Sequence, residues 1–189
     1  MKKTLVQPGS AIIADSVIVV ERIHPRAWVD QTVSIGPRTR VWQFASVIRG
    51  TVLGADCNVA SNATLDGPRF GDRCIICQGV AMGPGFVFGD DCFVGPNVVL
   101  CNDAFPATDK TGFDIEAFQK GAVTIRVGNG VTIGAGAIIL PGVTLGDYSC
   151  IGAGVVCDRN VPANYMLTRD GRLREIPPAL RRRRMKFLK

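Results

Sequence analysis

Amide side chains recur at matched positions along the first half of the chain. Gln43, Ser61 and Gln78 each follow an aliphatic residue of a regular series by two positions, and Asn62 and Asn97 fall in the next column. Such a row of hydrogen-bonding groups on one edge of the molecule can contact a polar substrate. It also suits an ordinary solvated face, because polar residues are common at turns.

A second group of candidate residues opens the long interruption of that regular series. Asp103 is a candidate to orient an amine or accept its proton, and Asn102 lies beside it, although the pair also suits a simple loop turn. Long loops in compact folds are usually functional or disordered. Disorder fits poorly with the apolar residues of this segment, which are Phe105, Phe113, Ile115 and Phe118. We therefore expect a loop at about 101–126 that acts as the lid or wall of a substrate site.

The elements that must position these residues follow from a period of six. One column of the repeat is aliphatic or bulky, the next position is often glycine, and a small apolar residue follows the aliphatic residue by four positions. The aliphatic series includes Ile23, Val29, Ile35, Val41, Val47, Leu53, Val59 and Leu65, and it resumes beyond the interruption at Val127, Ile133, Ile139, Leu145, Ile151 and Cys157.

A period of six fits neither an amphipathic helix nor simple strand alternation. It predicts a short strand followed by a sharp turn, with glycine allowing the tight bend. At three strands per coil the pattern gives roughly 6–7 coils, a prism on the order of 30 Å long at the usual strand spacing. We therefore predict a β-solenoid that places Cys57, Cys74, Cys92 and Cys157 in its core as filling residues.

The pattern of an aliphatic residue, glycine and a small residue resembles the hexapeptide-repeat acyltransferases over about residues 17–162. That resemblance implies an all-β fold, a left-handed parallel β-helix, and assembly as a homotrimer. Members that acetylate hydroxyls commonly use a histidine as general base, since a hydroxyl must lose its proton as it attacks. This chain has one histidine, His24, far along the predicted solenoid from the loop, where a structural role is expected.

An amine needs no such histidine, because it can attack as the neutral base. Catalysis would then depend on the alignment of two bound substrates and on donors at the developing oxyanion. Three segments are similar to the N-acetyltransferases of nucleotide-linked amino sugars, which supply bacterial surface-polysaccharide and lipopolysaccharide pathways: IHPRAWVD…IGPRTRVWQF, FGDDCFVGPNVVLCNDAFP and IGAGAIILPGVTLGDYSCIGAGVVCDRNVP.

This closer resemblance implies acetyl-CoA as co-substrate, a UDP- or dTDP-linked amino sugar as acceptor, and no metal. The segments that carry it contain Gln78, Asn102 and Asp103, which are expected to be catalytic, and Gln43 and Phe105, which are expected to bind substrate; the spacing of the amide row adds Asn62 and Asn97 as substrate-binding candidates. The chain departs from the family at Gln78, where asparagine is usual, and at Gln43, where histidine is usual. The pantetheine arm would meet Gly134, Ala135, Gly152 and Ala153, and the coenzyme phosphates Arg159, with Arg169 as a second candidate.

Composition limits the other classes. The net charge of +6 comes from residues 181–189, which carry six basic residues, while the rest of the chain holds 16 basic and 16 acidic residues. A nucleic-acid binder usually has a basic patch on its folded face, so no nucleic acid is expected as a partner. The tail suits a solvated helix, or attraction to cofactor phosphates or a membrane surface.

The remaining features favour a cytoplasmic protein with a single domain at 1–162 and a partly helical basic tail at 163–189. No apolar run is long enough to span a membrane, and 7 cysteines without a signal peptide favour reduced thiols. Cys74 and Cys77 form a lone CxxC that does not predict a zinc site. Two alternatives stay open: an O-acetyltransferase acting on a sugar hydroxyl, and a non-catalytic solenoid scaffold, which the inserted loop disfavours.

Overall fold

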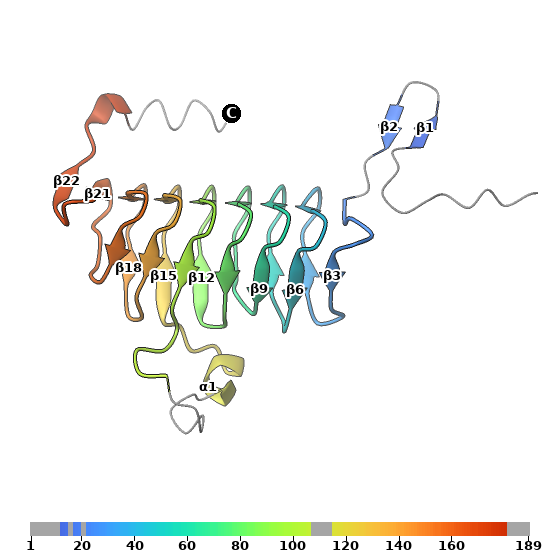
Figure 1. Ribbon diagram of the computed structural model, residues 1–189, viewed down its shortest axis with the longest axis horizontal. Helices are drawn as coiled ribbons and strands as arrows, with labels where there is room; N and C mark the ends of the chain where they lie inside the picture. The colour runs from blue at the N-terminus through green and yellow to red at the C-terminus, as the bar shows by residue number, and fades with distance from the viewer. Residues whose placement is uncertain (1–11, 15–16, 20–21, 107–114, 181–189) are drawn as a thin grey trace, which may run out of the picture.

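The chain forms a prism of short strands stacked along one axis (Figure 1), in a computed structural model that describes residues 12–14, 17–19, 22–106 and 115–180. Each turn of the coil adds about one strand to each of three faces, and stacked strands pair in parallel. One face holds 7 strands, so the predicted β-solenoid and its coil number are confirmed.

Two faces of the prism are continuous sheets, which we name after their first strands, and the third face has two parts. The β5 sheet contains β5 (Arg40–Val41), β8 (Asn58–Val59), β10 (Ile75–Ile76), β13 (Phe93–Val94), β16 (Thr132–Ile133), β19 (Cys150–Ile151), β21 (Tyr165–Leu167) and β22 (Leu173–Glu175). The β3 sheet contains β3 (Trp28–Val29), β6 (Ser46–Ile48), β9 (Thr64–Asp66), β11 (Ala81–Met82), β14 (Val99–Leu100), β17 (Ile138–Ile139) and β20 (Val156–Cys157). The third face contains β4 (Ser34–Ile35), β7 (Val52–Leu53), β12 (Phe86–Phe88), β15 (Ile125–Val127) and β18 (Thr144–Leu145), and Arg69 bridges its two parts.

The ends and the insertion depart from the coil. β1 (Ile12–Ala14) and β2 (Val17–Val19) form an antiparallel pair. β21 still pairs in parallel with β19, and β22 then returns antiparallel to β21 before residues 178–180 begin a helical turn. The basic tail predicted at 163–189 as partly helical thus begins with two strands and reaches a helical turn only at 178–180, and residues 181–189 lie outside the described residues. In the described residues no helix has the length and apolar character needed to cross a membrane.

The interior consists of the aliphatic and small columns that the sequence predicted. Val59, Ile76 and Ile133 are buried, whereas their neighbours on the outer side of the same strands are at least partly exposed. Cys57, Cys74, Cys92 and Cys157 are also buried, which confirms their predicted place in the core. Burying an aliphatic side chain contributes about 1.5–3 kcal/mol, so each turn adds several such increments to stability.

The glycine column was expected to allow tight bends, and the structure shows which side-chain clash it avoids. The glycines that follow the aliphatic residues do not take a left-handed backbone; they lie where stacked turns approach closely. A Cβ on Gly36 would lie 2.4 Å from the carbonyl carbon of Gly54, and one on Gly134 would lie 2.5 Å from the nitrogen of Ala153. The left-handed positions come two residues later, as at Asp56 (φ 58°).

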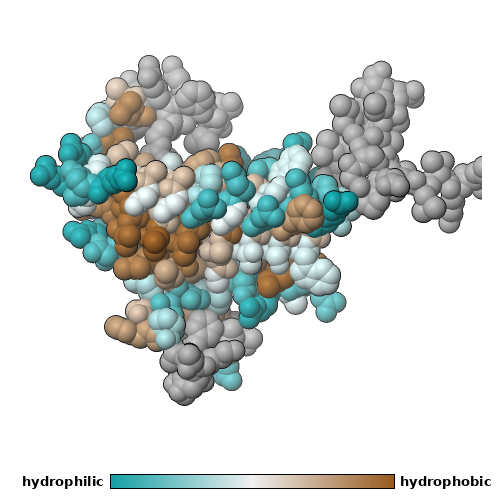
Figure 2. Space-filling model, viewed as in Figure 1, coloured by the Kyte–Doolittle hydropathy of each residue, from teal (hydrophilic) through white to brown (hydrophobic). Residues whose placement is uncertain are grey.

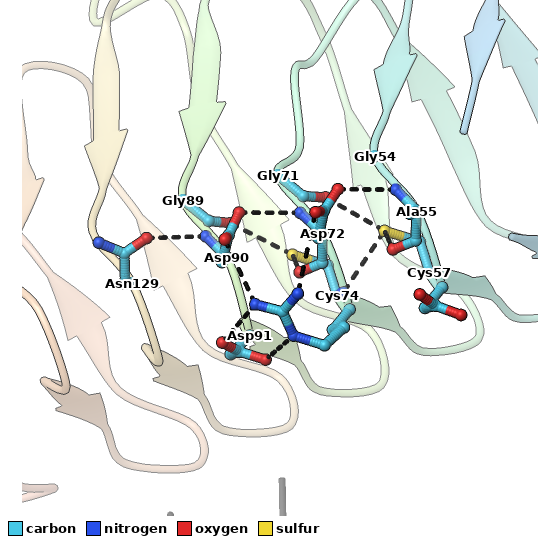
Figure 3. A network of polar contacts seen from close by, with 12 residues as sticks. Gly54, Ala55, Cys57, Gly71, Asp72, Cys74, Gly89, Asp90, Asp91 and Asn129 are labelled. Carbon is cyan, nitrogen blue, oxygen red and sulfur yellow. Dashed lines mark hydrogen bonds and ion pairs between the residues drawn. The ribbon is translucent and has the colours of Figure 1, made fainter. Parts of the chain in front are cut away.

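The edge between the third face and the β5 sheet is a stack of side-chain caps (Figure 3). The Asp72 carboxylate accepts from the nitrogen of Ala55 at 2.8 Å, Asp90 accepts from the nitrogen of Asp72 at 2.9 Å, and Asn129 accepts from the nitrogen of Asp90 at 2.9 Å. Arg73 pairs with Asp91 at 2.6 Å, and Figure 3 shows Asp91 below this row. We call this edge the acid edge; its side chains join one turn to the next.

Candidate functional site

The predicted amide row lies along one edge, between the β5 and β3 sheets, which we call the amide edge. The nitrogen of Asn62 donates to the carbonyl of Gln43 at 3.4 Å, and that of Asn97 donates to the carbonyl of Gln78 at 3.0 Å. Asn62, Gln78 and Asn97 are exposed, and Gln43 is half-buried. These bonds use backbone atoms, and the side chains are left for other contacts.

The same edge continues into the residues expected to meet the coenzyme. The nitrogen of Gly136 donates to the carbonyl of Pro96 at 2.8 Å, and that of Gly154 donates to the carbonyl of Ala135 at 2.9 Å. Ala135 and Ala153 are exposed, and Gly134 and Gly152 beside them are half-buried. The amide side chains and the small residues therefore form one continuous line.

The two arginine candidates for the coenzyme phosphates differ in position. Arg159 lies on the next edge of the prism and pairs with its neighbour Asp158 at 2.7 Å. Arg169 is exposed and follows the amide edge, since a Cβ on Gly152 would lie 3.8 Å from its nitrogen. The geometry thus aligns Arg169, rather than Arg159, with Gly152 and Ala153.

The inserted loop leaves from a different edge, between the β3 sheet and the third face, which we call the loop edge. Asn102 donates to the carbonyl of Pro84 on the preceding turn at 3.2 Å, and Asp103 accepts from the nitrogen of Phe105 at 2.8 Å. Phe105 is 89% exposed. Strand β14 separates these residues from the amide edge, so the loop does not open directly beside the predicted row.

A cavity of about 600 Å³ lies along the loop edge, and the sequence did not indicate it. Its walls come from four successive turns and from the returning end of the loop: Asp30, Thr32, Arg49, Gly50, Asp66, Gly67, Arg69, Pro84–Val87, Phe118 and Gly121–Val123. Its size is within the range of small-molecule sites. The loop is therefore the wall of a cavity on its own chain.

Asp66 is the unusual group in that cavity. One carboxylate oxygen pairs with Arg49, whereas Oδ1 is buried and has no hydrogen-bond partner within the described residues. A buried acceptor without a partner costs about 1–3 kcal/mol, so such atoms are uncommon. The sequence shows only that Asp66 follows the core residue Leu65 at a turn of the repeat. Polar residues are common at such turns, so this position did not identify Asp66 as a binding residue.

Asp30, by contrast, has both of its oxygens engaged. Oδ1 accepts from the hydroxyl and nitrogen of Thr32, and Oδ2 accepts from the nitrogen of Arg49 at 2.7 Å. These hydrogen bonds, led by that of the Thr32 hydroxyl, hold the pKa of Asp30 below its usual 3.8. Asp30 thus stabilises the wall of the cavity.

The loop is held on the prism by Phe118 from helix α1 (Ile115–Gln119). Phe118 is half-buried, and a Cβ on Gly85 would lie 2.5 Å from its ring. Thr124 donates through its hydroxyl to the carbonyl of Gly85 at 3.2 Å. Phe118 thus has the apolar contact that the sequence predicted, while Phe113 lies outside the described residues.

An apolar strip covers the outer side of the β3 sheet. Val99 and Val156 are 41% and 55% exposed, and strand register aligns them with Ala81 and Ile138. Figure 2 shows hydrophobic residues gathered on the viewed face toward the end of the prism that carries β18. Such a contiguous strip is typical of a surface that contacts a protein partner.

His24 and the residue types that could bind a metal ion were the other candidates for chemistry. His24 accepts a hydrogen bond at Nδ1 from the nitrogen of Arg26, at 3.1 Å, which fits the structural role expected of it. Across the described part of the chain, no cluster of three or more histidine, cysteine or acidic side chains is arranged to hold a metal ion.

Known proteins share the repeat and the fold. The family described as bacterial transferase hexapeptide (six repeats) matches residues 124–159. Galactoside O-acetyltransferase of Escherichia coli is 37% identical over 78 residues, covering 41% of this chain and 37% of that protein. The bifunctional protein GlmU of Pelobacter propionicus is 27% identical over 179 residues, covering 75% of this chain and 39% of that protein. The chain spans less than two fifths of the length of either relative.

A solved structure gives the same architecture over nearly the whole chain. A point mutant of AntD, an N-acyltransferase from Bacillus cereus in complex with dTDP and coenzyme A, has a TM-score of 0.53 at 16% identity, covering 88% of this chain and 86% of that one. At this identity the likeness concerns the fold. The family match over residues 124–159 and the shared fold agree with the resemblance seen in the repeats: this chain contains hexapeptide repeats and has the β-solenoid fold.

Proposed function

We propose that the protein is an acetyl-CoA-dependent N-acetyltransferase that acts on the amino group of a nucleotide-linked sugar, and that it works as a homotrimer. The observation that carries the proposal is the open end of the amide edge. Gly136 and Gly154 have no other atom within 4 Å of the place of a Cβ, and Ala135 and Ala153 are exposed. A slender chain such as pantetheine can lie there against backbone groups.

The chemistry needs no metal and no histidine. The neutral amine attacks the carbonyl carbon of the thioester, the carbon–sulfur bond breaks, and the sulfur leaves with the electron pair. The proton lost by nitrogen passes to that thiolate, so the products are the N-acetylated sugar and the coenzyme A thiol. The enzyme contributes by aligning amine and thioester and by placing donors at the developing oxyanion.

The assigned residues fit a site shared between subunits. Gln78 lies on the amide edge and Asp103 on the loop edge, so a single site that uses both residues draws them from two chains. In this arrangement Gln78 donates toward the reacting carbonyl, and Asp103 of a neighbouring chain, with Asn102 beside it, accepts the proton of the attacking amine and passes it to the departing thiolate. The exposed apolar strip at Val99 and Val156 supports such an assembly, because contact with a neighbouring chain would bury it.

The neighbouring proteins support the choice of substrates. AntD is described as an N-acyltransferase and its structure holds coenzyme A and dTDP. A hydroxyl acceptor is the second candidate, because the galactoside O-acetyltransferase shares 37% identity over 78 residues. The single histidine of this chain, His24, is engaged by the nitrogen of Arg26, which favours the amine.

The test is release of the coenzyme A thiol from acetyl-CoA, followed with dTDP- and UDP-linked amino sugars and with their hydroxyl counterparts. Turnover of the amino sugars alone is expected. Turnover of the hydroxyl sugars alone would establish O-acetylation, and absence of coenzyme A binding by calorimetry would establish a scaffold. Either result contradicts the proposal.

A matched pair of variants tests the coenzyme path. Ala153→Trp places a large ring on the amide edge and is expected to raise KM for acetyl-CoA by about tenfold or more, since misplacement of a substrate by an ångström is costly. Ala163→Trp places the same ring at an exposed position of the acid edge and serves as the control. Equal effects of the two changes would show that the coenzyme does not follow the amide edge.

A further inference from the structure

We propose that the loop-edge cavity holds the acceptor, with Asp66 accepting a hydrogen bond from the sugar amine and Arg69 binding a phosphate of the same molecule. The identity of this ligand rests on the proposed function. The assignment of the two contacts rests on the cavity itself.

Asp66 has an unused acceptor at the cavity wall. Its side chain is 17% exposed, and its pairing with Arg49 engages one carboxylate oxygen and leaves Oδ1 without a donor in the described structure. The terminal torsion of an aspartate is soft, so a small rotation can present this oxygen to the cavity. An amine supplies up to three donors and, when protonated, an opposite charge.

Arg69 supplies the complementary charge. It is exposed on the third face beside the cavity, and its side chain makes no ion pair with any described residue. Arg49, the other cation of the cavity, is already paired with Asp66. The planar guanidinium of arginine suits bidentate binding of a phosphate.

The remaining wall is apolar and close to both groups. Phe118 from the loop lies over Gly85, with Pro84 and Val87 beside it. An apolar wall lowers the local dielectric and excludes water, which strengthens the two polar contacts. A ligand that fits is compact, carries an amine at one end and a phosphate further along, and presents a sugar ring to Phe118.

The charges of the cavity support this choice over a simple anion or cation. Asp30 is saturated by Thr32 and the nitrogen of Arg49, and Arg49 is paired with Asp66. After these pairings, Oδ1 of Asp66 and the guanidinium of Arg69 are left without an ionic partner among the described residues of the cavity. A purely anionic ligand would leave Asp66 unmatched, and a purely cationic ligand would leave Arg69 unmatched.

The experiment is calorimetric titration of the full-length protein with three probes. Glucosamine 1-phosphate carries both groups, glucose 1-phosphate lacks the amine, and glucosamine lacks the phosphate. Asp66→Asn is expected to weaken glucosamine 1-phosphate by about tenfold or more, as for a lost charged hydrogen bond, and to change glucose 1-phosphate by less than about threefold. Arg69→Gln is expected to weaken both phosphates by about tenfold and glucosamine hardly at all.

Matched controls separate the cavity from general charge effects. Asp56→Asn removes another carboxylate that is paired with an arginine, Arg38, but lies outside the cavity. Arg126→Gln removes an exposed arginine of the same face, beyond Val87. Both controls are expected to bind all three probes as the unaltered protein does. A melting temperature and a coenzyme A titration for every variant confirm that it is folded.

The outcomes distinguish this inference from the proposed function. If amino sugars are acetylated but Asp66→Asn binds glucosamine 1-phosphate normally, the cavity assignment is wrong and the proposed function stands. If binding depends on Asp66 and Arg69 as stated but no acetyl transfer occurs, the assignment stands and the proposed function is wrong. Failure of the unaltered protein to bind glucosamine 1-phosphate at millimolar concentration, with coenzyme A still binding, also overturns the assignment.

Discussion

Replacing Gly85 by alanine is expected to lift the inserted loop from the prism. Gly85 has φ +92°, and an added Cβ would lie 2.5 Å from the Phe118 ring and 2.9 Å from the Thr124 hydroxyl. Gly121, at the other side of the same cavity, has φ +96° and nothing within 4 Å of the place of a Cβ. Alanine therefore has a similar backbone penalty at both positions, and only at Gly85 does its Cβ also clash with Phe118 and Thr124.

The sizes of the two effects follow from this difference. An alanine forced into a left-handed backbone costs about 1–2 kcal/mol in either variant. Moving half-buried Phe118 off the prism adds about 1 kcal/mol, because full burial of such a ring contributes about 1.5–3 kcal/mol. Gly85→Ala should thus lose about 1 kcal/mol more than Gly121→Ala, a Tm lower by about 2–4 °C for a domain of this size.

Differential scanning calorimetry and limited trypsin cleavage after Lys120 measure the prediction. Gly85→Ala should be cleaved faster there and should bind glucosamine 1-phosphate more weakly than Gly121→Ala. Adding Phe118→Ala should make the Gly85 substitution cost less, since the ring it displaces is gone. Equal melting temperatures and equal cleavage rates for the two glycine variants would refute the packing of Phe118 on Gly85.

The remaining predictions concern thiols, acid and the core. A hydrogen bond with Cys74 is the larger cause, and burial the smaller cause, of the raised pKa of Cys57; burial raises the pKa of Cys157. Both thiols should therefore react with a thiol reagent at pH 8 far more slowly in the folded than in the unfolded protein. The lowered pKa of Asp30 means that its stabilising contribution is present above its unfolded pKa and is lost as pH falls through its folded value; Thr32→Val should return that pKa toward 3.8 in a carboxyl NMR titration. Ile133→Ala should lower the free energy of unfolding by about 2–5 kcal/mol in a denaturant titration, because Ile133 is fully buried; a loss below about 1 kcal/mol would contradict its place in the core.

The fold was predictable because each turn repeats the same contacts. A residue such as Val59 pairs in register with Val41 before it and Ile76 after it, so one column of the sequence corresponds to one stack in the core. A period of six then fixes the strand, the turn and the coil together. Glycine was predicted to allow a tight bend without a side-chain clash, and the structure shows that the clash avoided is with the next turn of the stack.

The site was predictable only in part. The amide row and the small residues beyond it share one edge, as their spacing implied. The edge from which the loop departs was not predicted, because a period of six does not show which of three corners an insertion uses. Asp66 and Arg69 were missed for a related reason: they face a cavity only because the loop returns beside them with Phe118, after an interval that the repeat does not encode.

The three edges of the prism differ in what their side chains do, and this difference supports the placement of function. On the acid edge the side chains of Asp72, Asp90 and Asn129 each accept from a backbone nitrogen of the preceding turn, so they are committed to stacking. On the amide edge the turns are joined through backbone carbonyls, which leaves side chains such as Gln78 exposed. On the loop edge Asp66 keeps a buried acceptor that stacking does not use. Polar side chains on the amide edge and the loop edge are therefore available to bind a ligand, because the stacking of turns does not use all of them. The polar side chains of the acid edge instead hold successive turns together.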